Sequence, residues 1–114
     1  MDVRAVSRFF RALGDETRLR IVGLLSHGEL CVCHIQEALG LSQPNASRQL
    51  GVLRASGVVE DRRVGNWVYY RLRKMPDPEC ERHLRELAKS FGQHDPLRRD
   101  VAKLLKICGP GADR

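Results

Sequence analysis

The sequence predicts a mainly α fold with one small β-hairpin, an α+β arrangement. In successive segments, apolar residues return at three- and four-residue steps, which is typical of amphipathic helices. Between residues 58 and 73 the pattern changes to β-branched and aromatic residues on either side of Gly65 and Asn66. Such a pair favours a two-residue turn between two strands. The 114 residues, 42% of them hydrophobic, are enough for one small packed unit.

Two helices are expected before residue 28. Residues 3–13 place an apolar stripe on one face, and Gly14 follows as the expected end of that helix. Asp15 stands where a side chain can accept hydrogen bonds from the first free amides of a second helix. The apolar residues of this second helix continue until His27 and Gly28, which are expected to stop it.

A pair of helices with a short connection follows. The first is expected over residues 31–39, with Gly40 as a left-handed cap at its end. Ser42 is suited to begin the second helix, and Pro44 falls in its first turn, where a missing amide proton costs little. Gly57 is expected to close it. Two short helices joined in this way predict a helix-turn-helix.

The hairpin comes directly after this pair of helices, which is the position of a wing. Gly65 and Asn66 suit the first and second central positions of a type II′ turn. Arg62 and Arg63 are expected with Asn66 at the tip of the hairpin. The expected fold is therefore a winged helix-turn-helix.

The C-terminal part is expected to be helical. Prolines in residues 74–79 indicate a linker, after which helices are expected over 79–91 and around 101–107. We therefore expect a winged helix-turn-helix core with its N-terminal helix over residues 1–74. Residues 75–114 are expected to form a C-terminal helical segment for dimerisation.

Positive charge gathers in the helix-turn-helix and hairpin. The net charge is +6, and residues 42–74 contain seven Lys or Arg against two Asp or Glu, which gives +5 of that surplus. A basic surplus favours a polyanion, either nucleic acid or an anionic membrane. No apolar run approaches membrane-spanning length, and no secretory signal opens the sequence. We expect a cytoplasmic protein that binds double-stranded DNA and no membrane.

The second helix of the helix-turn-helix carries most of the side chains expected to contact DNA. Ala46, Leu50 and Leu53 form its inner stripe, so the opposite face presents short amides, hydroxyls and one Arg. Amides suit adenine, and Arg suits guanine or phosphate. One helix spans few base pairs, so two copies about 34 Å apart are expected. This indicates a homodimer formed through the terminal helices, whose apolar stripes have no other obvious partner. The expected DNA-binding residues are Ser42, Gln43, Asn45, Ser47, Arg48, Gln49, Arg62, Arg63 and Asn66.

Two of the four cysteines, Cys31 and Cys33, stand one residue apart at the start of the helix-turn-helix. In a reducing compartment, clustered cysteines usually indicate metal or redox chemistry. Residues i and i+2 do not share a face of a regular helix, so two thiolates that hold one ion need the backbone around Cys31 to leave helical geometry. The start of a helix is also expected to lower the pKa of a thiol, which favours the thiolate.

Four segments, in the same order, resemble the ArsR/SmtB family of winged-helix repressors: ALGDETRLRIVGLL, GELCVC, LSQPNASRQLGVLRASGVV and RRVGNWVYYRL. The resemblance implies a homodimer that represses a resistance operon until a toxic metal or metalloid binds. The ELCVC segment is similar to that of the arsenite/antimonite branch. This implies Cys31 and Cys33 as ligands of As(III) or Sb(III), the inducer, with no constitutive cofactor. Binding is expected to distort the first turn of the short helix, shift the neighbouring DNA-reading helix and weaken operator binding.

The ligand set and the inducer stay open on two points. The arsenite branch often has a third cysteine where this sequence has Gln36, so the third ligand would be Cys80, Cys108, solvent or a small thiol. The cadmium/lead branch carries a similar cysteine segment and adds cysteines in an N-terminal extension. This sequence has no cysteine before Cys31, which counts against cadmium or lead.

The sequence also allows three other kinds of chemistry to be considered: a zinc site, a redox switch and an enzyme. His83 and His94 have a spacing similar to the zinc site of the family, but Leu97 stands where an acidic partner is needed. Both are expected to be surface histidines. An alternative keeps the fold and makes the thiols a redox or persulfide switch. An enzyme is not expected, because no Gly-rich phosphate loop or HExxH motif accompanies the cysteines.

Overall fold

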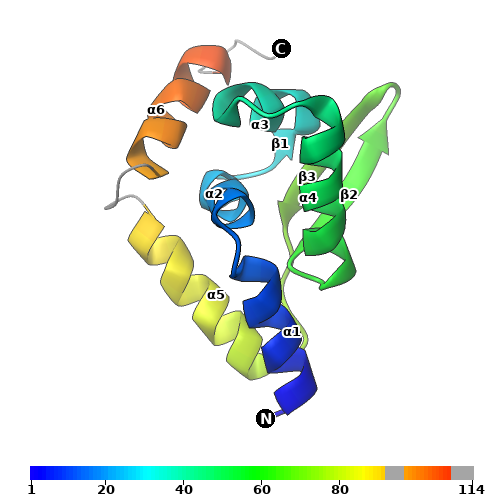
Figure 1. The fold of residues 1–114 in the computed structure, drawn as a ribbon, viewed down its shortest axis with the longest axis vertical. Helices are drawn as coiled ribbons and strands as arrows, with labels where there is room; N and C mark the ends of the chain where they lie inside the picture. Colours follow the sequence, from blue (N-terminus) through cyan, green and yellow to red (C-terminus); the bar gives the residue numbers. More distant parts are fainter. Residues whose placement is uncertain (92–96, 109–114) are drawn as a thin grey trace.

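The computed structural model describes residues 1–91 and 97–108, except for the side chains at 97, 98 and 108. α2 lies at the centre, the other helices surround it, and β2 and β3 project to one side (Figure 1). No helix in these ranges is long and apolar enough to cross a membrane. The elements are α1 (Val3–Leu13), α2 (Glu16–Leu25), β1 (Leu30–Cys31), α3 (Val32–Leu39), α4 (Gln43–Ala55), β2 (Val59–Val64), β3 (Trp67–Leu72), α5 (Pro78–Ser90) and α6 (Leu97–Cys108).

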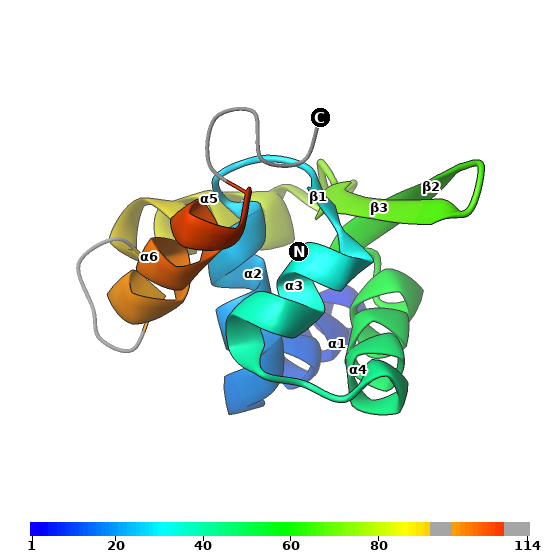
Figure 2. The same cartoon turned by 90° about the horizontal axis from the view of Figure 1, so that it is seen from above.

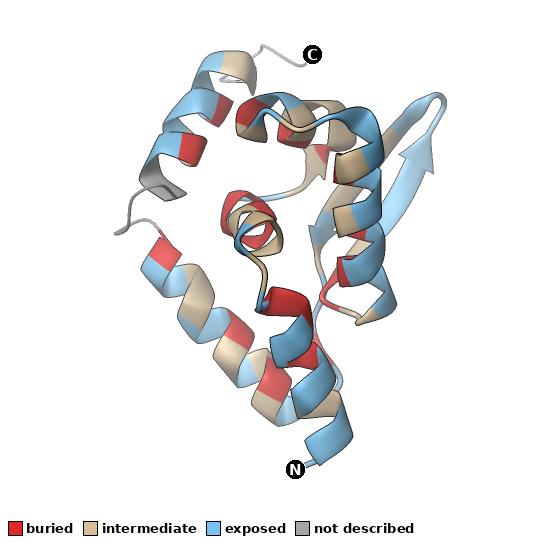
Figure 3. Cartoon of the chain, in the orientation of Figure 1, coloured by how far each residue is buried: buried red, intermediate tan, exposed pale blue. Residues whose placement is uncertain are grey.

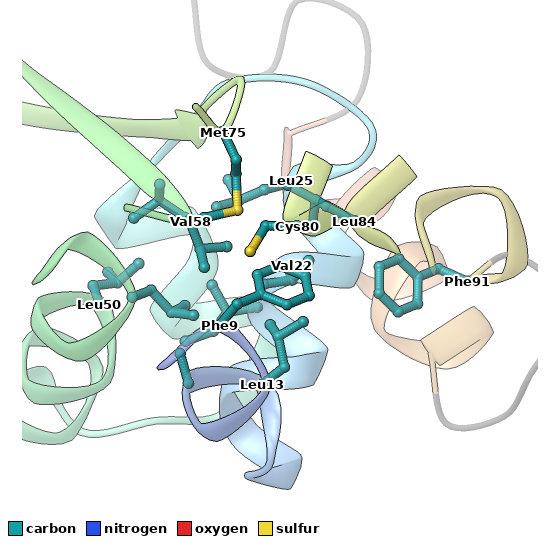
Figure 4. Close-up of a cluster of buried hydrophobic side chains, with 14 of the residues drawn as sticks. Phe9, Leu13, Val22, Leu25, Leu50, Val58, Met75, Cys80, Leu84 and Phe91 are labelled. Atoms are coloured by element: carbon teal, nitrogen blue, oxygen red, sulfur yellow. The ribbon is translucent and has the colours of Figure 1, made fainter. Parts of the chain in front are cut away.

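The core forms where the other elements enclose α2. Figure 3 shows buried residues on the sides of the helices that face the interior. Phe9, Ile21 and Leu50, from three different helices, are completely buried. Burial contributes about 1.5–3 kcal/mol for each large apolar side chain, so this cluster holds α1, α2 and α4 together. Figure 4 shows most of its members, which are Phe9, Ala12, Leu13, Ile21, Val22, Leu25, Ile35, Leu50, Leu53, Val58, Val59, Met75, Cys80, Leu84 and Phe91.

The first two helices form as the sequence predicts, but the N-terminal cap of α2 differs from the prediction. The carboxylate of Asp2 accepts hydrogen bonds from the amides of Arg4 at 3.0 Å and Ala5 at 3.3 Å, and so caps α1. Asp15 stands at the N-cap of α2, but its side chain makes no capping hydrogen bond. Its carboxylate lies 3.6 Å from Arg18 instead. The predicted side-chain cap is wrong, because the guanidinium attracts the carboxylate away from the amides.

α3 and α4 form the predicted helix-turn-helix. Gly40 ends α3 in the left-handed region at φ 66°, and the amide of Leu41 donates to the carbonyl of Gln36 at 2.9 Å. The hydroxyl of Ser42 accepts a hydrogen bond from the amide of Asn45 at 3.2 Å, which begins α4 as expected. These caps fix the short turn, and the turn fixes how α4 lies against α3.

The predicted hairpin joins β2 and β3 through a two-residue turn. Val64 pairs with Trp67, so the turn consists of Gly65 and Asn66. Gly65 has φ 59°, and among the described residues no residue other than glycine has a positive φ. This fits the predicted type II′ turn and excludes type I′, which needs a positive φ at both central positions.

The sequence does not predict β1, the third strand of an antiparallel sheet in the order β1-β3-β2. Its two residues, Leu30 and Cys31, pair with Tyr70 and Tyr69 of β3. A two-residue strand has no alternation to detect, since only its pairing with β3 makes it a strand. β1 fixes the backbone at Cys31 in an extended conformation, because Cys31 ends this strand and directly precedes α3.

α5 packs along α1 and completes the main core. It begins after Asp77, whose carboxylate accepts from the amides of Glu79 at 2.9 Å and Cys80 at 3.3 Å. Leu84, and Phe91 just after the end of the helix, are buried in the same cluster as the α1 residues. The division into a core over residues 1–74 and a dimerisation segment over 75–114 stays a prediction.

α6 packs on α2 and α3 through a second apolar cluster that includes Leu104. Arg20 of α2 donates two hydrogen bonds to the carboxylate of Asp100, at 2.6 and 2.8 Å. Asp100 is only 4% exposed, so this ion pair anchors α6 to the centre of the fold. Much of the apolar stripes of α5 and α6 therefore has partners within the chain, which corrects that part of the expectation, whereas Leu105 of α6 is 61% exposed.

Candidate functional site

Cys31 and Cys33 bring their sulfur atoms together where β1 passes into α3. Cys31 has extended backbone angles, φ −68° and ψ 142°, and Cys33 lies in the first turn of α3. The sulfur atoms are 2.9 Å apart, farther than the roughly 2.05 Å of a disulfide bond, and both thiols are free. The backbone at Cys31 thus departs from helical geometry, as two thiols on one ion require. The strand supplies this departure, so the sulfur atoms meet without any unwinding of α3.

The environment of Cys33 keeps its thiol protonated near neutral pH. Burial, together with the hydrogen bond to the Cys31 sulfur, raises the pKa of Cys33 to about 11. The amides of Cys33 and His34 lower the pKa, as expected for the first turn of a helix, but their effect is smaller. The prediction that the helix start lowers the pKa is therefore wrong for Cys33, because loss of contact with water outweighs the helix dipole.

The thiol pair lines a cleft between α3, the start of α4 and the wing. The volume of this cleft is about 610 Å³. Gln43 and Ser47 of α4 and Arg63 of the wing line it together with both cysteines. Figure 2 shows the β2–β3 hairpin extending past α4, with β1 and α3 beside it. The fold therefore brings together two groups of residues that are separate in the sequence, the thiols and the predicted DNA-contacting side chains.

Four of the six residues predicted to contact DNA at the N-cap and along α4 are exposed to solvent. The exposed ones are Ser42, Gln43, Ser47 and Arg48. Asn45 is half-buried, and its Oδ1 atom accepts from Nη2 of Arg48 at 2.8 Å and from Nε2 of Gln49 at 3.3 Å. The first of these bonds holds the Arg48 guanidinium beside Asn45, one turn earlier on α4.

Gln49 differs from its neighbours because its side chain is bound inside the protein. Its Oε1 atom accepts a hydrogen bond from Nη1 of Arg18 at 2.9 Å. Nε of Arg18 in turn donates to the carbonyl of Ala12 at 2.6 Å. Arg18 therefore connects α1, α2 and α4, and Gln49 helps to fix the position of α4 in the fold.

The two arginines predicted at the tip of the wing lie on opposite faces of the hairpin, since neighbouring residues of a strand alternate. Arg63 lines the cleft, as does Asn66 in the turn. Nε and Nη2 of Arg62 each donate to the carboxylate of Glu29 at 2.7 Å. The Arg62 guanidinium also lies 5.1 Å from the ring centre of Tyr69. Arg62 therefore lies in β2 three residues before the turn, with its guanidinium bound to an acidic residue next to β1, and its contact with DNA stays a prediction.

Sequence reasoning missed two further side chains of this region. Trp67 lines the cleft and is 56% exposed, and an aromatic residue directly after a hairpin turn is a signal that could have identified it. Glu29 opens the cysteine segment, but its partner Arg62 lies 33 residues further along the chain. That pairing depends on strand register, which the sequence does not reveal.

The structure removes one candidate for a third ligand. Cys80 is 1% exposed and lies in the main core near Phe9 and Met75 (Figure 4). Its sulfur donates to the carbonyl of Ala5 at 3.7 Å, and burial raises the pKa of its thiol. Cys80 is therefore wrong as a ligand beside the thiol pair.

The remaining candidates for metal binding give no second site in the described residues. No group of three or more His, Cys, Asp or Glu side chains there could hold a metal ion. His83 is half-buried between the ring of Phe10, at 5.4 Å, and the carboxylate of Glu79, at 3.6 Å. The side chain of Cys108 and all of His94 lie outside the described residues.

A helix-turn-helix, a hairpin wing beside its second helix and a polar, basic helix face define a winged helix-turn-helix regulator. Residues 15–61 match the family described as "Bacterial regulatory protein, arsR family". A 66-residue segment is 58% identical to the arsenical resistance operon repressor of Escherichia coli K12, and covers 57% of this chain and 56% of that protein. The crystal structure of the transcriptional repressor BigR from Xylella fastidiosa is 34% identical, with a TM-score of 0.64 over 78% of this chain and 88% of that chain. The chain belongs to the arsR family of bacterial regulatory proteins.

The chain is also similar to the solution structure of Mb0332 from Mycobacterium bovis, which is described as a homodimeric winged helix-turn-helix DNA-binding domain of a possible ArsR-family regulator. It is 32% identical, with a TM-score of 0.63 over 82% of this chain and 87% of that chain. These descriptions confirm the resemblance, the winged helix-turn-helix fold and the expectation of a transcriptional regulator. The matched segments span about half the length of the curated arsenic-resistance relatives.

Proposed function

We propose that the protein is a homodimeric transcriptional repressor of an arsenic-resistance operon, released from operator DNA when As(III) or Sb(III) binds Cys31 and Cys33. The shared cleft carries this proposal, because the thiol pair lines the same space as Gln43, Ser47 and Arg63. A ligand on the two sulfur atoms is therefore held within the surface proposed to contact DNA.

The exposed face of α4 supplies the contacts to DNA. Its polar side chains lie in the N-terminal half of the helix, which is the half that enters the major groove in a helix-turn-helix. The amide of Gln43 suits adenine, while Arg48 and Arg63 suit guanine or phosphate. Arg62 contributes to the charge of the wing from the face opposite the cleft. The basic surplus of residues 42–74 supplies the attraction to the phosphates that does not depend on base sequence.

A homodimer places two such surfaces on one duplex. The Mycobacterium bovis relative is described as homodimeric. Exposed apolar residues gather on α1, where Val3 is 73% exposed and Phe10 is 47% exposed. The Phe10 ring lies 5.4 Å from the ring of His83 on α5, so the exposed face continues from α1 onto a C-terminal helix. Pairing of α1 and α5 with a second copy would cover this face.

The two thiols suit a trivalent thiophilic ion such as As(III). In each of two exchanges, a sulfur–arsenic bond forms, an arsenic–oxygen bond of arsenious acid breaks, and the S–H proton leaves with the hydroxide as water. Because the pKa of Cys33 is raised, its thiol is protonated and carries the proton that leaves with the hydroxide as water. The sulfur atoms are already in contact, so both can reach one atom with little movement of the backbone.

Occupancy of the thiols acts on DNA binding through the neighbouring elements. Cys31 ends a strand that pairs with the wing, and Cys33 belongs to the helix that packs on α4. A tenfold loss of operator affinity needs a coupling free energy of only about 1.4 kcal/mol. Distortion of the first turn of α3 on binding stays a prediction.

The proposal is tested by titration of DNA-bound protein, followed by fluorescence anisotropy. A labelled duplex is first selected from a random-sequence pool with ligand-free protein. The complex is then titrated with arsenite, antimonite, cadmium, lead and zinc. Arsenite and antimonite are expected to release the DNA, and the Cys31→Ser/Cys33→Ser double variant is expected to bind DNA normally and to stay bound.

Cys80→Ala is the matched control, because Cys80 lies in the core and away from the cleft. This variant is expected to respond to arsenite as the wild type does. Release of the double variant by arsenite would show that the ligand assignment is wrong. Release of the wild type by cadmium or lead alone would show that the inducer is wrong.

A thiol redox switch is the second candidate, and the contact between the two sulfur atoms favours it. An oxidant that removes two electrons would join Cys31 and Cys33, or link one of them to a further thiol. The same anisotropy assay with mild peroxide, followed by mass spectrometry, separates the candidates. DNA release together with a disulfide, and no response to arsenite, would support the redox switch.

A further inference from the structure

We propose that Glu29, Arg62 and Tyr69, here named the wing clamp, transmit the occupancy of the thiol pair to the wing. These three are positioning residues, since they act on operator binding through the orientation of the hairpin. The inference rests on the proposed function and extends it, because it names the route by which the thiol site regulates the DNA-contacting surface.

The first part of the wing clamp is a bidentate ion pair between Arg62 and Glu29. Nε and Nη2 of Arg62 each lie 2.7 Å from an oxygen of the Glu29 carboxylate. Glu29 is two residues before Cys31, and Arg62 is in β2. Paired bonds of this kind fix orientation as well as distance. The segment that carries the cysteines is therefore fastened to the far strand of the wing.

Tyr69 lies between the cysteine segment and β2 and contacts both. It pairs with Cys31 of β1 on one side and with Arg62 of β2 on the other, because β3 is the central strand. The Arg62 guanidinium also lies 5.1 Å from its ring centre, within the range of a cation–π contact. One residue thus touches both the thiol-bearing strand and the arginine that binds Glu29.

The outer part of the wing needs such a connection, because the base of the hairpin packs into the main core through Val59 and Leu72, while residues 61–67 are exposed. An isolated two-stranded hairpin is marginally stable in water. β1 adds only two residue pairs to the sheet. A further ion pair, within the part of the chain that the structure describes, joins Asp61 of the hairpin to Arg54 of α4 at 3.1 Å. The wing is thus connected to α4 on one side and to the cysteine segment on the other, so a shift of Cys31 reaches the hairpin through the wing clamp.

The sheet contains a matched control for the wing clamp. Arg71 of β3 pairs with Glu60 of β2 at 2.6 Å, and both pairs are largely exposed to solvent. The Arg71–Glu60 ion pair joins the two strands of the hairpin, while the Arg62–Glu29 ion pair reaches the cysteine segment. Exposed ion pairs contribute little to stability, so loss of either pair leaves the protein folded. Glu29→Gln and Glu60→Gln also remove the same charge, so their direct effects on attraction to DNA are alike.

The first measurement is amide hydrogen exchange in the DNA-free, ligand-free protein. In Glu29→Gln, the amides of β1 and of the β3 residues paired with it are expected to exchange faster than in the wild type. In Glu60→Gln, exchange in β1 is expected to be unchanged. Wild-type exchange of β1 in Glu29→Gln would overturn the wing clamp, whatever arsenite does.

The second measurement is the ratio of operator Kd values with and without arsenite. In Glu29→Gln this ratio is expected to fall at least about fivefold, the lower end of ordinary allosteric coupling, while arsenite still binds the DNA-free protein. Glu60→Gln is expected to keep the wild-type ratio, and Tyr69→Leu is expected to behave like Glu29→Gln. An unchanged ratio in Glu29→Gln would show that the clamp is only structural. A wild type that arsenite does not release would overturn the proposed function, and the exchange result would still decide whether the clamp holds the wing.

Discussion

The sulfur of Cys31 lies 2.9 Å from the sulfur of Cys33, although one residue ends a strand and the other lies in the first turn of a helix. Side chains two residues apart on one regular helix point to different faces. The extended backbone at Cys31 turns its side chain back over the first turn of α3. Since Cys31 is held in a strand by its pairing with Tyr69, the contact between the two thiols depends on the wing.

Cys33 is expected to react slowly with alkylating reagents at neutral pH. Its raised pKa of about 11 leaves little thiolate, and the thiolate is the reactive form. The rate of carboxamidomethylation by iodoacetamide, followed by mass spectrometry, should keep rising well above pH 9. In a short peptide of the same sequence it should level off near the ordinary thiol pKa of about 9. A folded protein that levels off with the peptide would contradict the burial argument.

The same shift has a consequence for stability. A thiol whose pKa is raised in the folded state stabilises the fold below its unfolded pKa. This contribution is lost as the pH rises from about 9, the ordinary value, toward about 11. Urea unfolding of the wild type and of Cys33→Ala should therefore converge across this interval. A difference between them that stays constant with pH would contradict the expected linkage.

Gly40→Ala and Gly51→Ala are expected to change stability in opposite directions. Gly40 has φ 66°, where a side chain costs about 1–2 kcal/mol, although no atom would touch the new methyl group. Gly51 lies within α4 with open space beside it, so alanine there should stabilise the protein by about 0.5–1 kcal/mol. Urea unfolding measures both changes. Equal shifts would show that the left-handed cap at Gly40 has no special cost.

Much of the fold could be predicted from the sequence because its signals are local. The left-handed cap at Gly40, the hydroxyl cap at Ser42 and the hairpin turn at Gly65 each depend on residues close to them in the chain. β1 could not be predicted, because it exists only through pairing with a strand about 40 residues later. The failed cap at Asp15 has the same origin, since the competing Arg18 is fixed by its bond to Gln49 of α4.

The residues of the candidate site could be predicted from the sequence, but their arrangement in space could not. Cys31, Cys33 and the polar residues of α4 are readable from residue type and position. The alternation of strand faces, which separates Arg62 from Arg63, follows only once the register of the hairpin is known. The raised pKa of Cys33 depends on burial by the whole fold, and the local dipole argument gave the opposite sign.

Gln43→Ala and Gln49→Ala are expected to separate DNA contact from folding. Gln43 is exposed at the cleft, so its loss should weaken binding to the selected duplex by about 1–3 kcal/mol without changing stability. Gln49 is hydrogen-bonded to Arg18, so its loss should also lower the free energy of unfolding by about 0.5–1.5 kcal/mol. Anisotropy and urea unfolding on both variants give the comparison. A stability loss in Gln43→Ala as large as that in Gln49→Ala would refute the distinction.

Asp100→Ala is expected to release α6 from the centre of the fold. The Asp100 carboxylate is buried, and its loss leaves the Arg20 guanidinium without the partner that orients it. Because the Arg20 side chain keeps 28% exposure, water compensates in part, and the expected cost is about 1–3 kcal/mol. Faster amide exchange in α6 should accompany the loss. The double variant Arg20→Met/Asp100→Leu should recover most of the stability, since an apolar pair suits the same place.

Trp67 gives the protein a built-in optical reporter. It is the only tryptophan among the 114 residues, and it is 56% exposed at the end of the hairpin, on the rim of the cleft. Excitation near 295 nm therefore selects the wing alone, with no dye and no engineered label. Quenching by iodide in the free protein and in its complexes follows that one corner of the molecule in real time.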